Sequence, residues 1–177
     1  MNIFENRKQS KKIKEAMELV KIGNKRESEE SGKISLYFAS PFFNAEQVER
    51  EEYLKAKLRY LGYDVWSPKE ECHLNPNADI KLRKKVFYKN LDAILSCSAV
   101  FAVTDGKDMG TIWECGFAYA NSVPIIYFAE TLGDNPFNLM LAESGIHVLT
   151  SRKELKVGVI EEALENYKDY IFKGVIE

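Results

Sequence analysis

From Lys33 onward, short runs rich in β-branched and aromatic residues alternate with longer segments of helical periodicity. Strands separated by helices predict a parallel sheet, because parallel neighbours need crossover connections that commonly contain a helix. The expected strands are Ile34–Phe38, Tyr63–Trp66, Ala99–Val103, Pro124–Phe128 and His147–Thr150. The expected helices are Ala45–Leu61, which stops before Gly62, and Ile80–Cys97, Thr111–Asn121, Asn138–Glu143 and Lys153–Phe172.

These elements, in a chain of 177 residues, predict a single α/β domain with a doubly wound five-stranded parallel sheet. Right-handed crossovers favour the strand order 2-1-3-4-5, which reverses direction between the first and third strands. The ligand crevice of such a sheet lies at the carboxyl ends of those two strands. We therefore expect loops 39–44 and 104–110 to form the functional site.

The first 32 residues differ in pattern from the rest of the chain. A short apolar stripe of helical spacing is followed by a charged, glycine-punctuated run over 23–32. The stripe consists of Ile13, Ala16, Met17 and Val20. We expect an accessory helix and linker over residues 1–32, and the α/β domain over residues 33–177.

Charge and cysteine content restrict the partners of this chain. Lys+Arg 25 against Asp+Glu 27 give a net charge of -2, so neither a nucleic acid polymer nor an anionic membrane is expected to bind. Cys72, Cys97 and Cys115 fit neither a disulfide framework nor a CxxC pair, which indicates a reducing compartment. No apolar stretch reaches the ~20 residues that span a bilayer, and no signal peptide is evident. A soluble cytoplasmic protein that acts on small molecules is expected.

The loop after the third expected strand leads through a tight turn into a helix. Thr111 is expected to cap that helix, with Glu114 at its third position. Glu114 then either completes a capping box or serves as a catalytic carboxylate. Asp105 and Asp108 crowd the same crevice, and clustered carboxylates repel one another unless chemistry or a ligand uses them. This favours the catalytic interpretation, although an Asp-Gly turn explains Asp105 equally well.

The loop after the first expected strand carries Phe42 and Phe43 where a hydrophilic turn is usual. Exposed aromatic side chains at a crevice indicate base stacking or a subunit contact. The loop has no GxGxxG motif, and the chain has no GxxxxGK[ST] phosphate loop. His73 and His147 lack metal-ligand spacing, and there is no GxSxG elbow, so we expect no metal, no organic cofactor and no serine nucleophile.

Asn90 lies on or beside the apolar stripe of its expected helix, four residues after Val86 and four before Ile94. A polar side chain on a buried face needs hydrogen-bond partners. Asn90 is therefore either a satisfied core amide or a residue that reaches the floor of the crevice.

Three segments resemble the nucleoside 2-deoxyribosyltransferases. Leu36–Asn44 resembles the opening strand and loop of that family, and Asp108-x-Gly-Thr-x-Trp-Glu114-x-Gly resembles its nucleophile segment. Pro136–Met140 resembles a third family motif, and the resemblance spans Lys33 to Thr150. It implies a flavodoxin-like fold and base exchange on 2'-deoxynucleosides and free nucleobases without a cofactor. It also implies a homo-oligomer, from dimer to hexamer, with sites shared between subunits.

The resemblance implies individual roles as well. Glu114 would attack C1' of the deoxynucleoside, Tyr37 would orient Glu114, and Asp108 would contact the base and assist its protonation. Asn138 would bind the sugar 5'-hydroxyl across a subunit boundary, and Asn90 stands where the family usually has an aspartate near the base. The expected substrate-binding residues are Phe42, Phe43, Asn90, Asp105, Gly110, Asn138 and Met140.

A carboxylate at a helix N-terminus is stabilised in its ionised form, so Glu114 is expected to be deprotonated at neutral pH. It would then trap the sugar covalently, as retaining glycosidases do. Two alternatives remain open. A deoxynucleoside 5'-monophosphate N-glycosidase would need phosphate donors in the first loop, which reads Ser-Pro-Phe-Phe. A non-catalytic nucleotide-sensing module would bind the same ligands without turnover.

Overall fold

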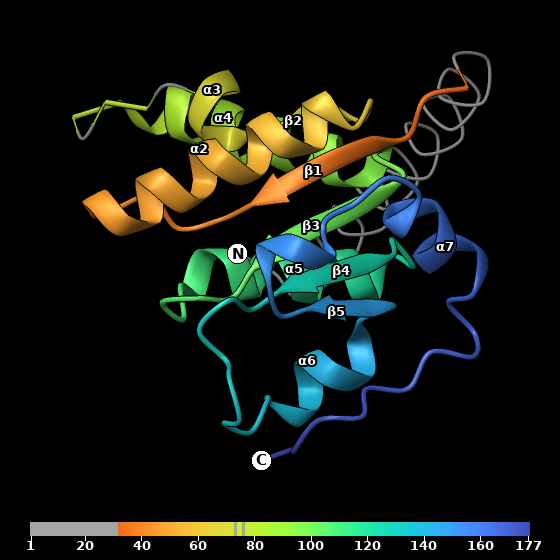
Figure 1. Cartoon of the computed structure of the whole chain (residues 1–177). Helices are drawn as coiled ribbons and strands as arrows, with labels where there is room; N and C mark the ends of the chain where they lie inside the picture. The colour runs from red at the N-terminus through yellow and green to blue at the C-terminus, as the bar shows by residue number, and fades with distance from the viewer. Residues whose placement is uncertain (1–31, 73, 76) are drawn as a thin grey trace, which may run out of the picture.

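The computed structural model describes residues 32–72, 74–75 and 77–177, and it contains the predicted five-stranded parallel sheet (Figure 1). The strand order is β2-β1-β3-β4-β5, as predicted, and all four pairings are parallel. The predicted accessory helix and linker lie outside the described residues, apart from Gly32. The strands are β1 (Ser35–Ala39), β2 (Asp64–Trp66), β3 (Ala99–Val103), β4 (Ile125–Phe128) and β5 (His147–Leu149).

The connecting helices cover both faces of this sheet. Their bounds are α2 (Ala45–Tyr60), α3 (Pro68–Glu71), α4 (Ile80–Ser96), α5 (Met109–Ala120), α6 (Leu139–Ser144) and α7 (Val159–Glu165), with a 3₁₀ turn at Arg152–Glu154. Gly62 has φ 101°, a conformation that favours glycine, and its N–H bonds to the Arg59 carbonyl, so it ends α2 as predicted. No helix in the described part of the chain is long and apolar enough to cross a bilayer.

The C-terminal helix is much shorter than predicted. The predicted helix Lys153–Phe172 is replaced by the 3₁₀ turn, a loop and the seven-residue α7. Gly158 adopts a left-handed conformation with φ 82° directly before α7, which prevents one continuous helix. After α7 the chain runs back along the molecule and pairs at Ile176 with Phe137, just before α6.

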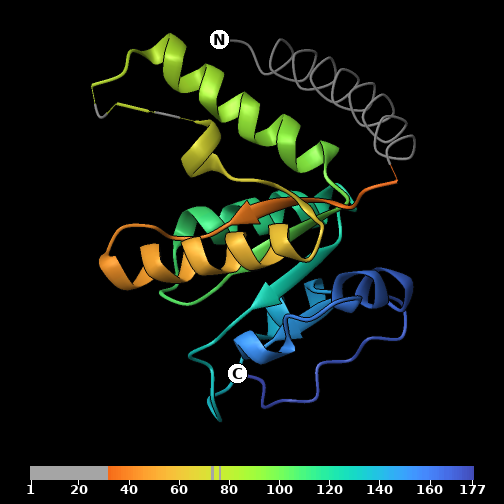
Figure 2. The same ribbon diagram turned by 45° about the horizontal axis from the view of Figure 1, so that its top comes forward.

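Alternate residues of the central strands enter two separate cores. Leu36 and Phe38 of β1 pack with α2 and α7, whereas Tyr37 and Ala39 pack with α4, α5 and α6. Helices α2 and α5 accordingly lie on opposite sides of the sheet (Figure 2). Because side chains alternate along a strand, this register directs Tyr37 toward α5.

An ion-pair cluster holds the short helix α3 against α2. Lys55 is almost fully buried, and its Nζ lies 2.9 Å from Glu51 Oε1 and 2.7 Å from Glu70 Oε1. Arg59 and Lys69 add further ion pairs between the two helices. Buried charges are tolerated when they are paired in this way. The cluster therefore determines where the chain leaves α3 and turns toward α4.

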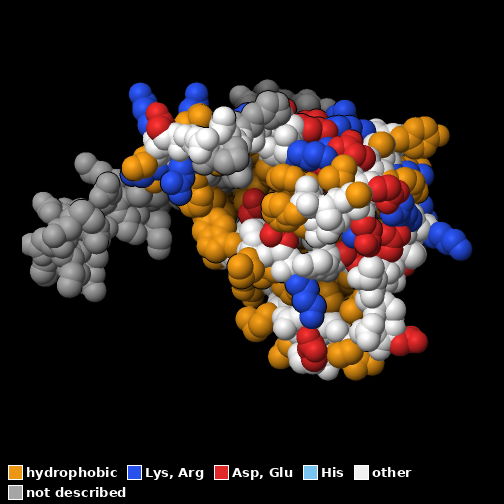
Figure 3. Space-filling model, turned by 90° about the vertical axis from the view of Figure 1, so that its left-hand side faces the viewer, with side chains coloured by type: hydrophobic (Ala, Val, Ile, Leu, Met, Phe, Trp, Pro, Cys, Tyr) orange, Lys and Arg blue, Asp and Glu red, His pale blue; other side chains and the backbone are white. Residues whose placement is uncertain are grey.

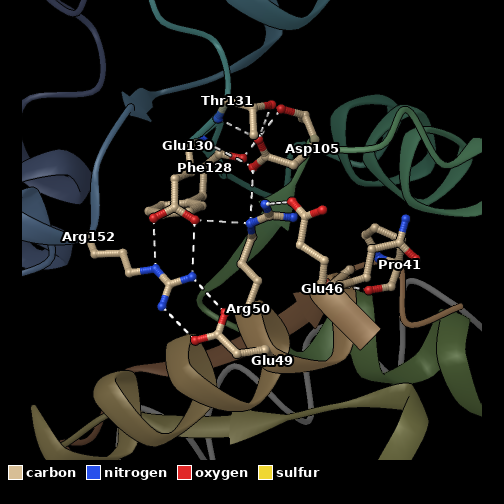
Figure 4. Close-up of polar contacts among 12 residues, drawn as sticks. Pro41, Glu46, Glu49, Arg50, Asp105, Phe128, Glu130, Thr131 and Arg152 are labelled. Atoms are coloured by element: carbon tan, nitrogen blue, oxygen red, sulfur yellow. Dashed lines mark hydrogen bonds and ion pairs between the residues drawn. The ribbon is translucent and has the colours of Figure 1, made fainter. Parts of the chain in front are cut away.

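Asp105 ties the loop after β3 to the loop after β4 (Figure 4). Its carboxylate accepts hydrogen bonds from the Glu130 N–H at 3.0 Å, the Thr131 N–H at 2.6 Å and the Thr131 hydroxyl at 2.6 Å. Arg50 Nε lies 4.0 Å from the same carboxylate. Asp105 is buried and both of its oxygens have protein partners, so it has a structural role, and its expected substrate contact stays a prediction.

Two arginines extend this junction to α2 and to the C-terminal side of the sheet (Figure 4). Arg50 bonds to Glu130 at 3.1 Å and to Glu46 at 2.7 Å. Arg152 bonds to Glu130 at 2.7 Å and holds Glu49 through two bonds of 2.8 Å. The loops at the carboxyl edge of the sheet are thus fastened to α2 by a continuous polar network.

We expect Asp105→Ala to lower the free energy of unfolding by about 2–4 kcal/mol, because it leaves buried donors and Arg50 without their acceptor. Urea denaturation followed by circular dichroism measures this change. Glu49→Ala is the matched control, because it removes a carboxylate whose side chain is 59% exposed from the same network. Its expected cost is at most about 1 kcal/mol. Equal effects of the two substitutions would contradict the structural role of Asp105.

Candidate active site

Tyr37 and Glu114 meet at the carboxyl side of the central strands. Tyr37 is fully buried in β1, and its hydroxyl donates a 2.6 Å hydrogen bond to Oε1 of Glu114 on α5. The two residues are 77 positions apart in the sequence. The structure thus brings together two of the three residues that the resemblance marks as catalytic.

Burial raises the pKa of Glu114 to about 7, and the negative charge of Asp108 acts in the same direction. The hydrogen bond from Tyr37 opposes this rise by stabilising the carboxylate. Burial and the charge of Glu114 also raise the pKa of Tyr37 well above its usual range, so Tyr37 remains a hydrogen-bond donor. A carboxylate with this pKa is poised to change its charge near neutral pH.

The start of α5 differs from the prediction in a way that explains this pKa. The helix begins at Met109 and Asp108 is its cap, so Thr111 is the third helical residue and the predicted capping box of Thr111 and Glu114 is absent. Glu114 therefore lies in the second turn. The helix dipole acts within the first turn, so burial controls Glu114 and the predicted stabilisation by the helix N-terminus is wrong.

Asp108 is fixed by its capping contacts. Its Oδ2 accepts hydrogen bonds from the Thr111 N–H at 2.7 Å and from the Thr111 hydroxyl at 2.9 Å. Gly110 makes room for this arrangement, because a Cβ there would lie 3.1 Å from Asp108 Oδ2. Oδ1 accepts no hydrogen bond from the part of the chain that the structure describes.

Trp66 forms a wall of the site that the sequence analysis did not identify. Its ring stacks on Tyr37 with centroids 5.1 Å apart and planes at 19°. Lys89 Nζ lies 5.8 Å from the centre of the same ring. The predicted topology could have identified Trp66 as a site residue. Trp66 is the last residue of the second strand and lies beside Tyr37 in the parallel register.

Asn90 is half-buried on α4 and has a partner that was also missed. The Cys72 thiol donates a 3.1 Å hydrogen bond to Asn90 Oδ1. Lys89, the preceding residue, bonds to the carbonyl of Glu71 at 2.6 Å, so two successive residues of α4 hold the end of α3. Asn90 is therefore anchored to Cys72 at the C-terminal end of α3.

The aromatic loop after β1 is exposed, as the sequence predicts. Phe42 is 38% exposed and Phe43 is 73% exposed, and their rings stack on each other with centroids 5.3 Å apart. Figure 3 views the carboxyl edge of the sheet, where hydrophobic side chains lie beside acidic ones. This edge offers both apolar contact surface and carboxylates.

Asn138 and Met140 belong to the loop and the helix that follow β4. Asn138 caps α6 and accepts a 3.1 Å hydrogen bond from the Met140 N–H. Both residues line a cavity of about 410 Å³ between the loops after β3 and β4, together with Gly106 and Ile112. None of the contacts among the described residues connects them to Tyr37 or Glu114.

The described residues contain no group of three or more His, Cys, Asp or Glu side chains arranged to hold a metal ion. The site offers a half-buried carboxylate, a phenol that donates to it, and a second carboxylate at the start of the same helix. Such a set can stabilise and trap a cationic carbon, and can move a proton at a nearby leaving group.

The chain is similar to a known protein family and to solved structures. The family model for nucleoside 2-deoxyribosyltransferase matches residues 36–153, which is more than half of the chain. Among solved structures, a 2-deoxyribosyltransferase from the psychrotolerant bacterium Bacillus psychrosaccharolyticus is similar at 28% sequence identity and a TM-score of 0.60. The match covers 78% of this chain and 93% of that protein.

A conserved protein from Enterococcus faecalis V583 has the same fold, with 24% identity and a TM-score of 0.55. That match covers 77% of this chain and 98% of the other. No curated protein sequence matches significantly. The family match includes β1, the aromatic loop and the helix that carries Glu114. The chain therefore belongs to the nucleoside 2-deoxyribosyltransferase family.

Proposed function

We propose that this protein transfers the 2-deoxyribosyl group between nucleobases through a covalent intermediate on Glu114, with retention of configuration. The 2.6 Å hydrogen bond from Tyr37 to Glu114 carries the proposal, because it orients this half-buried carboxylate and leaves its second oxygen to react. The substrates are 2'-deoxynucleosides and free nucleobases, and the reaction uses no metal or organic cofactor.

The first step displaces the base from the sugar. An oxygen of ionised Glu114 attacks C1', the C1'–N bond breaks, and its electrons pass to the base. The developing positive charge on the sugar is stabilised by the carboxylate before the covalent bond forms. In the second step a nitrogen of the incoming base attacks C1' and releases Glu114, so two inversions give net retention.

The proposed role of Asp108 is to exchange a proton with the leaving base. Its Oδ2 is occupied by Thr111, and Oδ1 is left to exchange a proton with a nitrogen of the base. The charge of Asp108 raises the pKa of Glu114, which places the two carboxyls close enough to interact. One carboxyl attacks while the other handles the proton, a division of labour common in glycoside chemistry.

Transfer requires that water be kept from the covalent intermediate until the second base arrives. Trp66 covers Tyr37 on one side, and the exposed pair Phe42 and Phe43 lies on the loop that follows β1. The same loop has no cationic side chain for a 5'-phosphate, which favours nucleosides over nucleotides as substrates.

The exposed aromatic loop supports a homo-oligomer. Asn138 and Met140 would enter the site of a neighbouring subunit, where Asn138 would bind the 5'-hydroxyl of the sugar. Exposed aromatic pairs of this kind are commonly covered by a partner.

We expect Glu114→Gln to lower the rate of base exchange by at least about 10³-fold, because an amide cannot form the glycosyl ester. The assay incubates the enzyme with 2'-deoxyinosine and adenine and separates the products by chromatography. Appearance of 2'-deoxyadenosine reports exchange, and free deoxyribose reports hydrolysis. Glu143→Gln, a change on α6, is the control and retains exchange. Undiminished exchange by Glu114→Gln would contradict the covalent role.

The raised pKa of Glu114 predicts opposite pH effects on activity and stability. The free enzyme needs ionised Glu114, so kcat/KM should rise as pH increases through about 7. Folding favours the protonated form, so stability should fall as pH rises from the unfolded pKa of 4.5 to above 7. A shift of this size corresponds to roughly 3 kcal/mol at most.

Melting temperatures of the wild type and Glu114→Gln between pH 5 and pH 8 measure the stability effect. Glu114→Gln carries no ionisable group at this position, so the wild type should lose stability relative to it as pH rises. Parallel curves for the two proteins would show that Glu114 is not protonated by burial.

A shared site predicts complementation between two inactive variants. Glu114→Gln removes the nucleophile and Asn138→Ala removes the proposed sugar contact of the neighbouring site. Mixed after dissociation, they should form hybrid pairs with one intact site, and exchange should recover to about a quarter of the wild-type value in a dimer. Mixing without recovery, although the wild type is oligomeric in light scattering, would contradict the sharing of Asn138.

A further inference from the structure

Asn90 has hydrogen-bonding capacity that the described residues do not use. Its Oδ1 accepts the hydrogen bond from the Cys72 thiol, whereas its Nδ2 donates to no group among the described residues. An amide nitrogen carries two donor hydrogens. Because Asn90 is half-buried, donors without a protein acceptor are available to a ligand.

The position of Asn90 relative to Glu114 follows from the contacts between α4 and α5. Phe87, one turn before Asn90, contacts Trp113, the residue before Glu114, with ring centroids 5.6 Å apart. Lys89 lies over Trp66, which stacks on Tyr37, the partner of Glu114. Asn90 and Glu114 are therefore connected from two sides, through the contact between α4 and α5 and through Trp66 and Tyr37.

The hydrogen bond from Cys72 determines whether the oxygen or the nitrogen of the Asn90 amide faces away from α3. Burial raises the pKa of the Cys72 thiol, so the sulfur keeps its proton and can donate it. A carbonyl oxygen is a much stronger acceptor than a sulfur atom, so S–H to Oδ1 is preferred over N–H to sulfur. The clamp between Lys89 and Glu71 and the ion pairs of α3 hold Cys72 in place.

We propose that Cys72 is a positioning residue that turns the Asn90 N–H₂ group toward the nucleobase, so that the site selects bases presenting a carbonyl oxygen there. Hypoxanthine and guanine, which carry a 6-oxo group, are then favoured over adenine, whose 6-amino group would face the amide donors. This inference rests on the proposed function for the identity of the ligand as a nucleobase.

The preference for an oxo base follows from the free-energy cost of placing two hydrogen-bond donors opposite each other. A carbonyl oxygen accepts from Asn90, whereas an amino group leaves donors on both sides without an acceptor. The cost of such unpaired groups corresponds to roughly a ten- to hundredfold preference for the oxo base. A pure stability effect would change the reaction with both bases equally, so the ratio of the two kcat/KM values isolates the positioning role.

The experiment compares acceptor bases within each enzyme preparation. 2'-Deoxyuridine supplies the sugar, and hypoxanthine and adenine are the acceptors. The wild type should favour hypoxanthine roughly ten- to hundredfold in kcat/KM, and Cys72→Ala should reduce that ratio by roughly tenfold because the amide is free to rotate. Cys72→Ser keeps a donor and should retain the preference. A wild-type preference for adenine would overturn the proposal.

A double-mutant cycle provides the matched control. If Cys72 acts through Asn90, Cys72→Ala should have no further effect on the base ratio in an Asn90→Ala background. The same change in both backgrounds would overturn the positioning role. Asn90→Asp should alter both the base ratio and the pH profile, since its carboxyl can either donate or accept.

Calorimetric titration of free hypoxanthine and free adenine gives a second measurement that does not depend on turnover. The wild type should bind hypoxanthine more tightly, and Cys72→Ala should bring the two affinities together. Selective binding without exchange would contradict the proposed function and support this inference. Exchange with equal use of both bases would overturn the inference and leave the proposed function standing.

Discussion

The hydrogen bond between Tyr37 and Glu114 is the interaction on which the site depends. It joins the central region of the sheet to the helix that follows β3, so it forms only when β1 and β3 are neighbours and their residues alternate in the observed register. A doubly wound sheet brings the carboxyl ends of these two strands together at its switch point. The topology therefore creates the contact between a phenol on β1 and a carboxylate on the helix that follows β3.

This arrangement works against stability. Glu114 is ionised only at the expense of folding, because burial raises its pKa to about 7. The neighbouring polar network provides rigidity elsewhere. Asp105 binds two backbone N–H groups and lies against Arg50, while Lys55 is held by buried and half-exposed glutamates beside α3. The unfavourable burial of the Glu114 carboxylate can persist because the loops around it are fastened independently.

The sequence predicted the fold well because buried parallel strands appear as short apolar runs, and each observed strand lies within one residue of its predicted range at either end. Local geometry at helix ends was less predictable. Asp108 and Thr111 are both good caps, and the choice between them depends on a turn that residue types alone do not determine. Gly158 marks the break before α7, but a glycine need not adopt the left-handed conformation. Cys72 was missed because its importance comes entirely from a contact across 18 residues.

The amide at Asn90 separates two tasks that a carboxyl group can combine. A carboxyl can recognise a base edge and also supply a proton, whereas an amide can only recognise, because it does not titrate near neutral pH. In the proposed reaction the proton therefore comes from Asp108, whose Oδ1 is unoccupied by the described residues. The proposed recognition on α4 and the proposed proton transfer on α5 then depend on separate contacts, Cys72 for the first and Thr111 for the second. Substitution of either contact should disturb one task while leaving the geometry of the Tyr37 and Glu114 pair unchanged.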